Sequence, residues 1–292
     1  MKHVEAEIAS QPECWQRGVA LAGSLAEQLP RHSERVAVVG CGTSWFIAMA
    51  YASLRERAGH GETDAFAASE FPGQRRYDRV VAISRSGTTT EVLDLLRAVA
   101  GGSRTTGIVG DPHSPVAALV DDAVCLPFAD EQSVVQTRFA TTTLAVLRAH
   151  LGQDVAPAIR DATEALAAPL PLNPATLEQV TFLGREWTVG LAHEAALKCR
   201  EAAGFWTEAY PAMDYRHGPI AITGPDRAVW ALGAVPAGLP DDVARTRATF
   251  VHSVRDPMAD LILAQRLAVA LALHRGLDPD APRNLTRSVV LP

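Results

Sequence analysis

The chain has 292 residues, of which 48% are hydrophobic and 21% charged, so it can bury a core in one large domain or two of ordinary size. Its formal net charge of −6 disfavours nucleic acid or an anionic membrane as a partner. The chain has no run of about 20 apolar residues and no recognisable signal peptide, so it is expected to be cytoplasmic. Its four cysteines form no CxxC pair, so neither a disulfide framework nor a zinc site is expected.

Apolar runs and helical periodicity alternate through the first half of the chain. Residues 1–32 are expected to form an N-terminal helix that Pro30 closes. The pattern then predicts strands at 36–39, 63–67, 80–83, 105–109 and 123–126, and helices at 45–58, 90–100, 114–120 and 139–152. This alternation implies parallel βαβ units with helices on both faces of a sheet, an α/β/α sandwich.

The second half restarts the pattern after an Ala- and Pro-rich stretch, 156–174, which we interpret as a linker. A strand that ends at Gly184 before an Ala-rich helix echoes the strand that ends at Gly40. Coincidence is the alternative, because strand–Gly–helix units are common in α/β folds. A second strand at 229–235 and an amphipathic helix at 256–275 follow. The expected domains are the N-terminal helix 1–32, a first lobe 33–155, a second lobe 175–281 and a C-terminal tail 282–292.

A polar turn, Ser84–Glu91, directly follows the apolar run 80–83 and precedes a helix. It carries five hydroxyls, Arg85, and Gly87, which can adopt positive φ. Helix N-termini bind anions, so this turn favours a phosphate site over the alternative of a helix cap rich in hydroxyls. The turn 40–44 ends another strand at the same sheet edge, and we expect both turns to line one crevice.

A second group of polar residues begins at Glu194. Lys198 and Glu201 share one face of a predicted helix with Glu194, an arrangement that is often only a solvated, salt-bridged surface. The loop that follows, 208–219, gathers His217 with two tyrosines and other charged residues before Gly-Pro. A histidine so close to a Lys/Glu helix favours general acid–base chemistry.

Together these motifs resemble the sugar isomerase (SIS) family, and most closely the isomerase half of glucosamine-6-phosphate synthase. The resemblance spans about residues 33–289, with the motifs in family order. It is carried by Gly42-Thr43-Ser44, Ser84-x-Ser86-Gly87-x-Thr89, Glu194-x-Ala196-Leu197-Lys198-x-x-Glu201, Arg216-His217-Gly218-Pro219 and the tail Pro282–Val289. It implies two SIS-type lobes and a tail that closes the site.

The resemblance also implies roles for individual residues. Glu201 would shuttle a proton between adjacent sugar carbons, Lys198 would stabilise charge beside it, and His217 would help to open the sugar ring. Because the family's histidine reaches in from a neighbouring subunit, a homodimer with shared active sites is implied, with no metal and no cofactor. The phosphate would be held by Ser84, Arg85, Ser86 and Thr89, and the rest of the substrate by Gly42, Thr43, Ser44, Val134, Gln136 and Arg287.

The chain departs from the family pattern at positions that matter for chemistry. Arg287 replaces the tail lysine that forms a Schiff base, and arginine is not a practical nucleophile of that kind. Arg85 stands where the synthase has glutamine, and Gln136 where it has serine. Covalent capture of a ketose is therefore not expected.

The expected function is conversion of a hexose or amino-sugar 6-phosphate by proton abstraction beside the carbonyl, as an aldose–ketose isomerase or a deaminase. One alternative is a dehydratase or lyase acting on glucosamine or N-acetylglucosamine 6-phosphate without a Schiff base. Another is a phosphosugar sensor without catalysis, because fold alone does not fix function. Glutamine-dependent amination is not expected, because no glutaminase domain precedes the first lobe.

Overall fold

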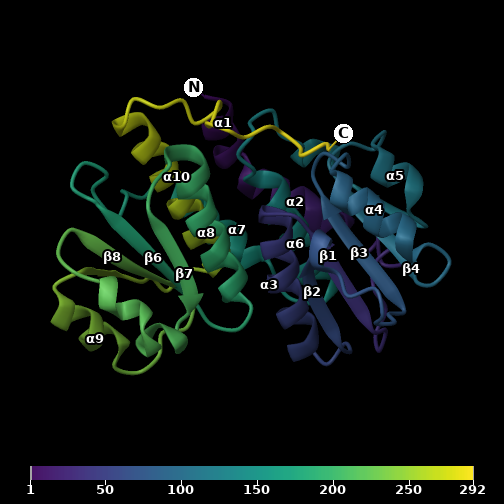
Figure 1. Ribbon diagram of the computed structural model, residues 1–292, viewed down its shortest axis with the longest axis horizontal. Coiled ribbons are helices and arrows are strands. Elements are labelled where there is room, and N and C mark those ends of the chain that lie inside the picture. The colour runs from purple at the N-terminus through teal and green to yellow at the C-terminus, as the bar shows by residue number, and fades with distance from the viewer. Residues whose placement is uncertain (1, 292) are drawn as a thin grey trace. The chain divides into compact units, whose positions relative to one another are not determined.

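The computed structural model describes residues 2–291, which form two parallel β-sheets flanked by helices (Figure 1). The chain divides into two units, each built around one of these sheets. The five-stranded unit comprises Glu13–Gln132, Gln136–Val155 and the chain from Thr286 onward, and the four-stranded unit comprises the chain up to Pro12, Ser133–Val135 and Ala156–Leu285. The predicted class, two α/β lobes with parallel sheets, is therefore confirmed.

The sheet of the five-stranded unit has the order β2-β1-β3-β4-β5, and all its neighbouring strands are parallel. Its strands are β1 (Val36–Gly40), β2 (Thr63–Ala67), β3 (Arg79–Ser84), β4 (Arg104–Val109) and β5 (Asp122–Cys125). β1 and β3 are buried along their whole length, which explains their runs of Val, Ala and Ile, because helices cover both faces of such a sheet. The carboxyl ends of these strands lie at one edge, where the polar turns follow.

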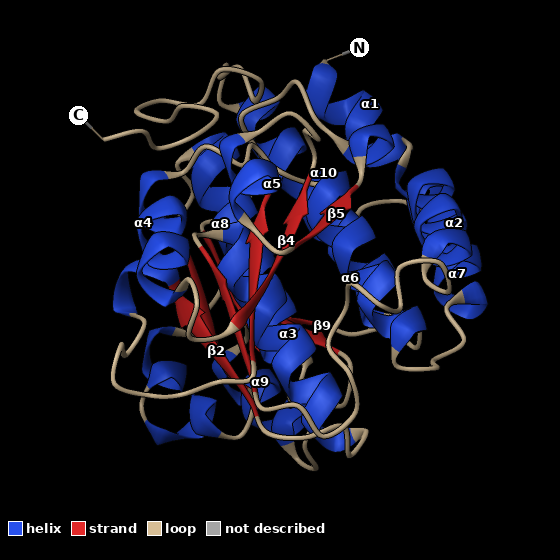
Figure 2. Cartoon of the chain, turned by 90° about the vertical axis from the view of Figure 1, so that its right-hand side faces the viewer, coloured by secondary structure: helices blue, strands red, loops and turns tan. Residues whose placement is uncertain are grey.

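Helices cover the two faces of this sheet. α4 (Thr90–Val99) and α5 (Pro115–Leu119) pack on one face, and α3 (Thr43–Arg57) packs against α6 (Arg138–His150) on the other. Figure 2 shows α4 and α6 on opposite sides of β4. Short 3-10 helices, η1 (Ala68–Glu70) and η2 (Pro127–Ala129), follow β2 and β5.

The four-stranded unit repeats this design with the sheet order β7-β6-β8-β9, again with parallel pairs. Its strands are β6 (Gln179–Gly184), β7 (Thr207–Pro211), β8 (Arg227–Leu232) and β9 (Thr249–Val251). Its helices are α1 (His3–Ala9), α7 (Ala156–Ala167), α8 (Thr188–Ala203), η3 (Asp214–His217), η4 (Pro219–Ile222), α9 (Leu239–Thr246) and α10 (Pro257–His274). α10 packs along α8 and α7 and is buried over most of its length.

The first strand of each sheet ends in a glycine for a steric reason. A Cβ atom at Gly40 would lie 2.7 Å from the backbone of Ser44, and one at Gly184 would overlap the backbone of Thr188. Real Cβ atoms do not approach so closely, so the helix that follows can start beside the strand only when this residue is glycine. The echo between Gly40 and Gly184 in the sequence thus reflects the same strand-to-helix geometry.

Two predictions about connecting segments are wrong. The proposed linker at 156–174 begins with α7, because its alanines are strong helix formers and Ala158, Ala162 and Ala165 are buried along one side. The N-terminal segment is two helices, α1 and α2 (Gln11–Leu21), with turns in place of helix from residue 22 to Pro30. Gly23 and Ser24, which are weaker helix formers than alanine or leucine, follow directly after the end of α2.

Further corrections fall in the four-stranded unit. The stretch 208–219, predicted as a loop, starts within β7 and continues into η3, while α9 and β9 were not predicted. α10 was expected to be amphipathic, yet it is buried on nearly all sides. By its length and composition alone, α10 could cross a membrane, but 72% of its residues are buried inside the protein, as in the core helix of a globular domain.

Candidate active site

The turn between β3 and α4, Ser84–Thr89, is hereafter called the anion cradle. Gly87 adopts φ 62°, and a Cβ atom there would overlap the side chain of Ser114, so no other residue fits. The Gly87 N–H donates a 3.2 Å hydrogen bond to the Ser84 hydroxyl, which tightens the turn. The N-terminus of α4, at Thr90, adds backbone N–H donors and a partial positive charge, which suit an anion.

Arg85 brings a buried positive charge to the cradle. Its Nη1 lies 3.8 Å from Oε2 of Glu131, and both side chains are almost completely buried. The other oxygen of Glu131 accepts hydrogen bonds from the backbone N–H groups of Thr137 and Arg138, at 2.5 and 2.9 Å, at the start of α6. Glu131 therefore fixes both the guanidinium and the following helix, a role that the sequence patterns did not reveal.

A cavity of about 30 Å³ opens between the cradle and the turn that follows β1. Seven of the residues proposed from the sequence line it, namely Ser44, Ser84, Arg85, Ser86, Thr89, Gln136 and Arg287, together with Cys41, Ile83 and Val92. Gly42 and Thr43 are not among its lining residues, although Gly42 precedes α3 with φ 54° and Thr43 begins that helix. Val134 belongs to the four-stranded unit.

The last residues of the chain also reach the cradle. Arg287 forms a 2.5 Å ion pair with Asp130, and its carbonyl accepts a 2.8 Å hydrogen bond from Arg85. The Ser288 hydroxyl lies 3.1 Å from that of Ser86 and 2.9 Å from that of Thr88. Asp130 and Ser288 were not predicted as site residues, because only contact between distant parts of the sequence reveals them. Thr88 was counted among the five hydroxyls of the turn but was given no role of its own.

α8 carries a row of three charged side chains. Lys198 Nζ lies 2.5 Å from Oε2 of Glu201 and 3.4 Å from Oε1 of Glu194. Glu194 and Lys198 are buried, and the Glu201 side chain is 21% exposed. The alternative of a solvated salt-bridged face is therefore wrong, and of the two carboxylates only Glu201 is exposed to solvent or a ligand.

Glu201 lies in the wall of a pocket of about 590 Å³ in the four-stranded unit. Three arginines also line this pocket, Arg200, Arg275 and Arg283, along with Asn284. Arg275 donates to the carbonyls of Ala203 and Gly204 at the end of α8, which satisfies acceptors that a helix terminus leaves open. The carboxylate thus faces a space that can admit a polar molecule.

His217 is exposed at the end of η3. The neighbouring Arg216 anchors this turn through a 2.5 Å ion pair with Asp242 and a 2.8 Å hydrogen bond to the Ala237 carbonyl. Gly218 follows with φ 143°, a conformation that favours glycine. The imidazole is therefore presented to solvent on an anchored turn.

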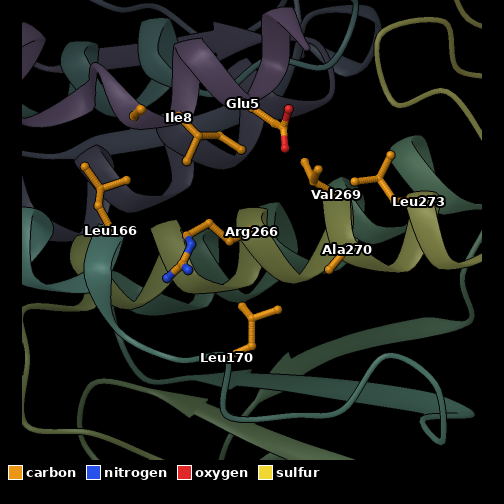
Figure 3. Close-up of a pocket in the computed structure, with 9 residues that line it drawn as sticks. Glu5, Ile8, Leu166, Leu170, Arg266, Val269, Ala270 and Leu273 are labelled. Atoms are coloured by element: carbon orange, nitrogen blue, oxygen red, sulfur yellow. The ribbon is translucent and has the colours of Figure 1, made fainter. Parts of the chain in front are cut away.

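Other features of the described residues lie apart from these groups. An apolar pocket of about 330 Å³ lies among α1, α7 and α10, and Figure 3 shows Arg266 among its leucine, isoleucine and valine side chains. None of the proposed site residues lines it. Within residues 2–291, no group of three or more His, Cys, Asp or Glu side chains is arranged to hold a metal ion.

Comparison with known proteins identifies a SIS domain at residues 31–151. The chain is 29% identical to glutamine–fructose-6-phosphate aminotransferase (isomerizing) from Gloeobacter violaceus over 91% of its own length and 53% of the relative. It thus spans about half the length of the curated relatives it matches. The match to the SIS family model thus falls on residues 31–151 of the chain.

Solved structures share the fold over nearly the whole chain. Glucosamine-6-phosphate deaminase from Thermotoga maritima has a TM-score of 0.84 at 23% identity, covering 99% of this chain and 100% of that one. Tagatose-6-phosphate ketose/aldose isomerase from Escherichia coli has a TM-score of 0.81 at 18% identity, covering 99% and 96%. The same two-lobed fold therefore carries different reactions, so the reaction must be argued from side chains.

Proposed function

We propose that the protein converts a hexose or amino-sugar 6-phosphate by abstracting a proton from the carbon beside the carbonyl, as an aldose–ketose isomerase or a deaminase. The observation that carries this proposal is the buried Glu194–Lys198–Glu201 row, in which only Glu201 is accessible. A sensor that only binds its ligand has no need for a carboxylate held in this way. The names of the related proteins, which include a deaminase and a ketose/aldose isomerase, agree with this class of substrate.

The chemistry divides into binding and proton transfer. The cradle residues Ser84, Ser86 and Thr89 would donate hydroxyl hydrogen bonds to the phosphate, and Arg85 would supply charge. Glu201 would act as the base, and Lys198 would hold it in place and stabilise the negative charge that develops on the substrate. The remaining contacts to the sugar are assigned to Gly42, Thr43, Ser44, Val134, Gln136 and Arg287. None of these steps requires a metal or a cofactor.

His217 is assigned to ring opening, because it is an exposed imidazole on an anchored turn. By the family resemblance it would serve the active site of a second subunit, so we propose a homodimer with shared sites. The protein would work in the cytoplasm, where its sugar phosphate is dissolved, with neither nucleic acid nor membrane as a partner.

A specific observation also favours a second candidate, a dehydratase or lyase. Arg287, at the position of the family's Schiff-base lysine, lines the cradle cavity and pairs with Asp130. A guanidinium stays protonated and does not form an imine, so a reaction that eliminates a substituent after proton abstraction fits this residue as well as isomerisation does.

Proton NMR in D₂O tests the proposal. The protein is incubated separately with fructose, glucose, glucosamine and N-acetylglucosamine 6-phosphates, while the C2 proton and new product signals are followed. Loss of the C2 proton signal with one of them is the expected result, and the product distinguishes isomerase, deaminase and dehydratase. Thermal stabilisation by a sugar phosphate without any exchange would contradict the proposal and favour the sensor.

A further inference from the structure

The pocket of about 330 Å³ in the four-stranded unit takes no part in the proposed function, because none of the residues assigned to that function lines it. It lies among α1, α7 and α10 (Figure 3), and all of its lining residues belong to this one unit. Pockets for small molecules have volumes of about 300–1,000 Å³ and are lined mainly by apolar side chains with a few polar groups. This pocket has that size and that composition, so it is suited to a small ligand.

Apolar side chains from three helices form most of the pocket wall. Ile8 and Val269 are buried, whereas Leu273 is 48% exposed. Leu166 and Leu170 are half-buried. Residues 2–291 therefore leave an apolar surface open to solvent here. A hydrocarbon chain that packed against it would remove apolar surface from water on both sides, which is favourable.

Arg266 brings a positive charge into this apolar pocket. Its Nη1 donates to the carbonyls of Ala165 and Ala168, at 2.6 and 2.7 Å, at the end of α7. These hydrogen bonds fix the guanidinium but do not neutralise it. Among residues 2–291, no carboxylate pairs with Arg266, and the structure shows no hydrogen bond from its Nε or Nη2. Burial lowers the pKa of the Arg266 guanidinium, yet arginine stays protonated in proteins, so the charge lacks a counter-ion.

Glu5 places a negative charge at another part of the pocket wall. Figure 3 shows its carboxylate on the side of Leu273, which follows Arg266 by seven residues on α10. Seven residues of α-helix span about 10 Å. The Glu5 Oε2 accepts a 2.8 Å hydrogen bond from the Lys2 N–H, which holds the carboxylate at the first turn of α1. The two charges therefore mark different ends of the pocket.

We propose that this pocket binds an amphipathic monocarboxylate, whose carboxylate pairs with Arg266 and whose hydrocarbon body lies against the apolar wall. A guanidinium can donate two parallel hydrogen bonds to a carboxylate, and Nε and Nη2 are the donors that remain for this. The ligand carries one carboxylate only, because a second one at the far end would meet Glu5. A cationic head group would be repelled by Arg266. The site is separate from the proposed sugar-phosphate chemistry, and neither depends on the other.

Isothermal titration calorimetry of the full chain tests the proposal with octanoate, octanol and octanedioate, each at concentrations too low for micelles. Octanoate should bind about tenfold more tightly than octanol or better, the worth of a hydrogen bond to a charged group. Octanedioate should bind more weakly than octanoate. Arg266→Leu should raise the Kd of octanoate to that of octanol and leave the Kd of octanol within about twofold of its wild-type value. This comparison separates loss of the charge from a general change of the pocket, which would weaken both ligands.

Two alanines of α1 test the location of the site. Ala9 lines the pocket, and Ala6 is exposed on the same helix but does not line it. Ala9→Phe should obstruct the pocket and abolish octanoate binding, whereas Ala6→Phe, the matched control, should bind octanoate like the wild type.

Three results would overturn the proposal. The first is equal affinity of the wild type for octanoate and octanol, and the second is octanoate binding that neither Arg266→Leu nor Ala9→Phe weakens. The third is absence of octanoate binding. In that case, a sedimentation coefficient that falls in Ala9→Phe but not in Ala6→Phe would identify a second copy of this chain as the occupant of the pocket.

Discussion

Replacing Glu201 by Gln tests the proposed base directly. The substitution preserves side-chain length and an oxygen that can accept from Lys198, which lies 2.5 Å from the carboxylate. It removes the group that takes the proton. General-base catalysis contributes about 10²–10⁴-fold to rate, so the barrier should rise by about 3–5 kcal/mol.

Other properties of the Glu201→Gln protein should change little. Glu201 is partly exposed, and Lys198 keeps Glu194 at 3.4 Å, so the free energy of unfolding should fall by less than about 3 kcal/mol. Glu201 is not among the residues that line the cradle cavity, so the Kd of inorganic phosphate should be unchanged.

The assay is the rate of C2 proton exchange in D₂O, measured with the sugar phosphate on which the wild type acts. Glu164→Gln is the matched control, because Glu164 is an exposed carboxylate on α7 of the same unit. The control should exchange at the wild-type rate. Exchange within about threefold of the wild type in Glu201→Gln would remove Glu201 as the base and with it the proposed mechanism.

Three further predictions concern the five-stranded unit. Arg79→Ala should lower the free energy of unfolding by about 3–5 kcal/mol in urea, because it removes the buried guanidinium that lies 2.9 Å from Glu34 and from Asp122. Arg104→Ala, which removes the more exposed of the two arginine partners of Asp122, should cost less than about 1 kcal/mol. Equal losses would contradict this account. Burial raises the pKa of the Glu34 and Asp122 carboxyls, but hydrogen bonds from arginine outweigh it and hold both pKa values below their ordinary values. Above about pH 4 the ionised carboxylates stabilise the folded state, and this stabilisation is lost as the pH falls through their pKa values in the folded protein. The Tm of Arg79→Ala should therefore fall less steeply below about pH 4 than the Tm of the wild type. Burial and the nearby Glu91 charge raise the pKa of the Cys41 thiol to about 11, so its iodoacetamide alkylation, followed by mass spectrometry, should rise about tenfold per pH unit from 7 to 10; a plateau near pH 9 would refute the shift.

Local patterns were enough to predict the β3–cradle–α4 unit. An apolar run buried on both faces, a polar turn with glycine, and Val92, Leu95 and Leu96 at helical spacing all agree on one arrangement. The linker prediction failed because alanine and proline are common both in linkers and in the first turn of a helix. Proline near the first turn of an Ala-rich segment starts a helix as readily as it interrupts one, and Pro157 lies in the first turn of α7.

Burial and long-range contact account for the features that the sequence could not reveal. The spacing of Glu194, Lys198 and Glu201 predicts a shared helix face, but it does not distinguish a solvated surface from a buried ion pair. That distinction depends on packing within the four-stranded unit. In the same way, nothing near Ser86 indicates that Ser288, 202 residues away, hydrogen-bonds to it.

In the proposed site, Arg287 limits the chemistry that the protein can perform. Its guanidinium pairs with Asp130 and its carbonyl accepts a hydrogen bond from Arg85, so both ends of the residue are engaged. A protonated guanidinium recognises carboxylate or phosphate oxygens and does not add to a carbonyl carbon. The outcome then depends on the step after Glu201 removes the proton: return of the proton to the neighbouring carbon gives isomerisation, and departure of a substituent gives elimination. The test is an Arg287→Lys variant, incubated with a ketose phosphate and borohydride, which traps an imine as a stable adduct. An adduct in the variant and none in the wild type would show that this one residue separates the two kinds of chemistry. Absence of an adduct in both would show that the surrounding cradle also prevents imine formation.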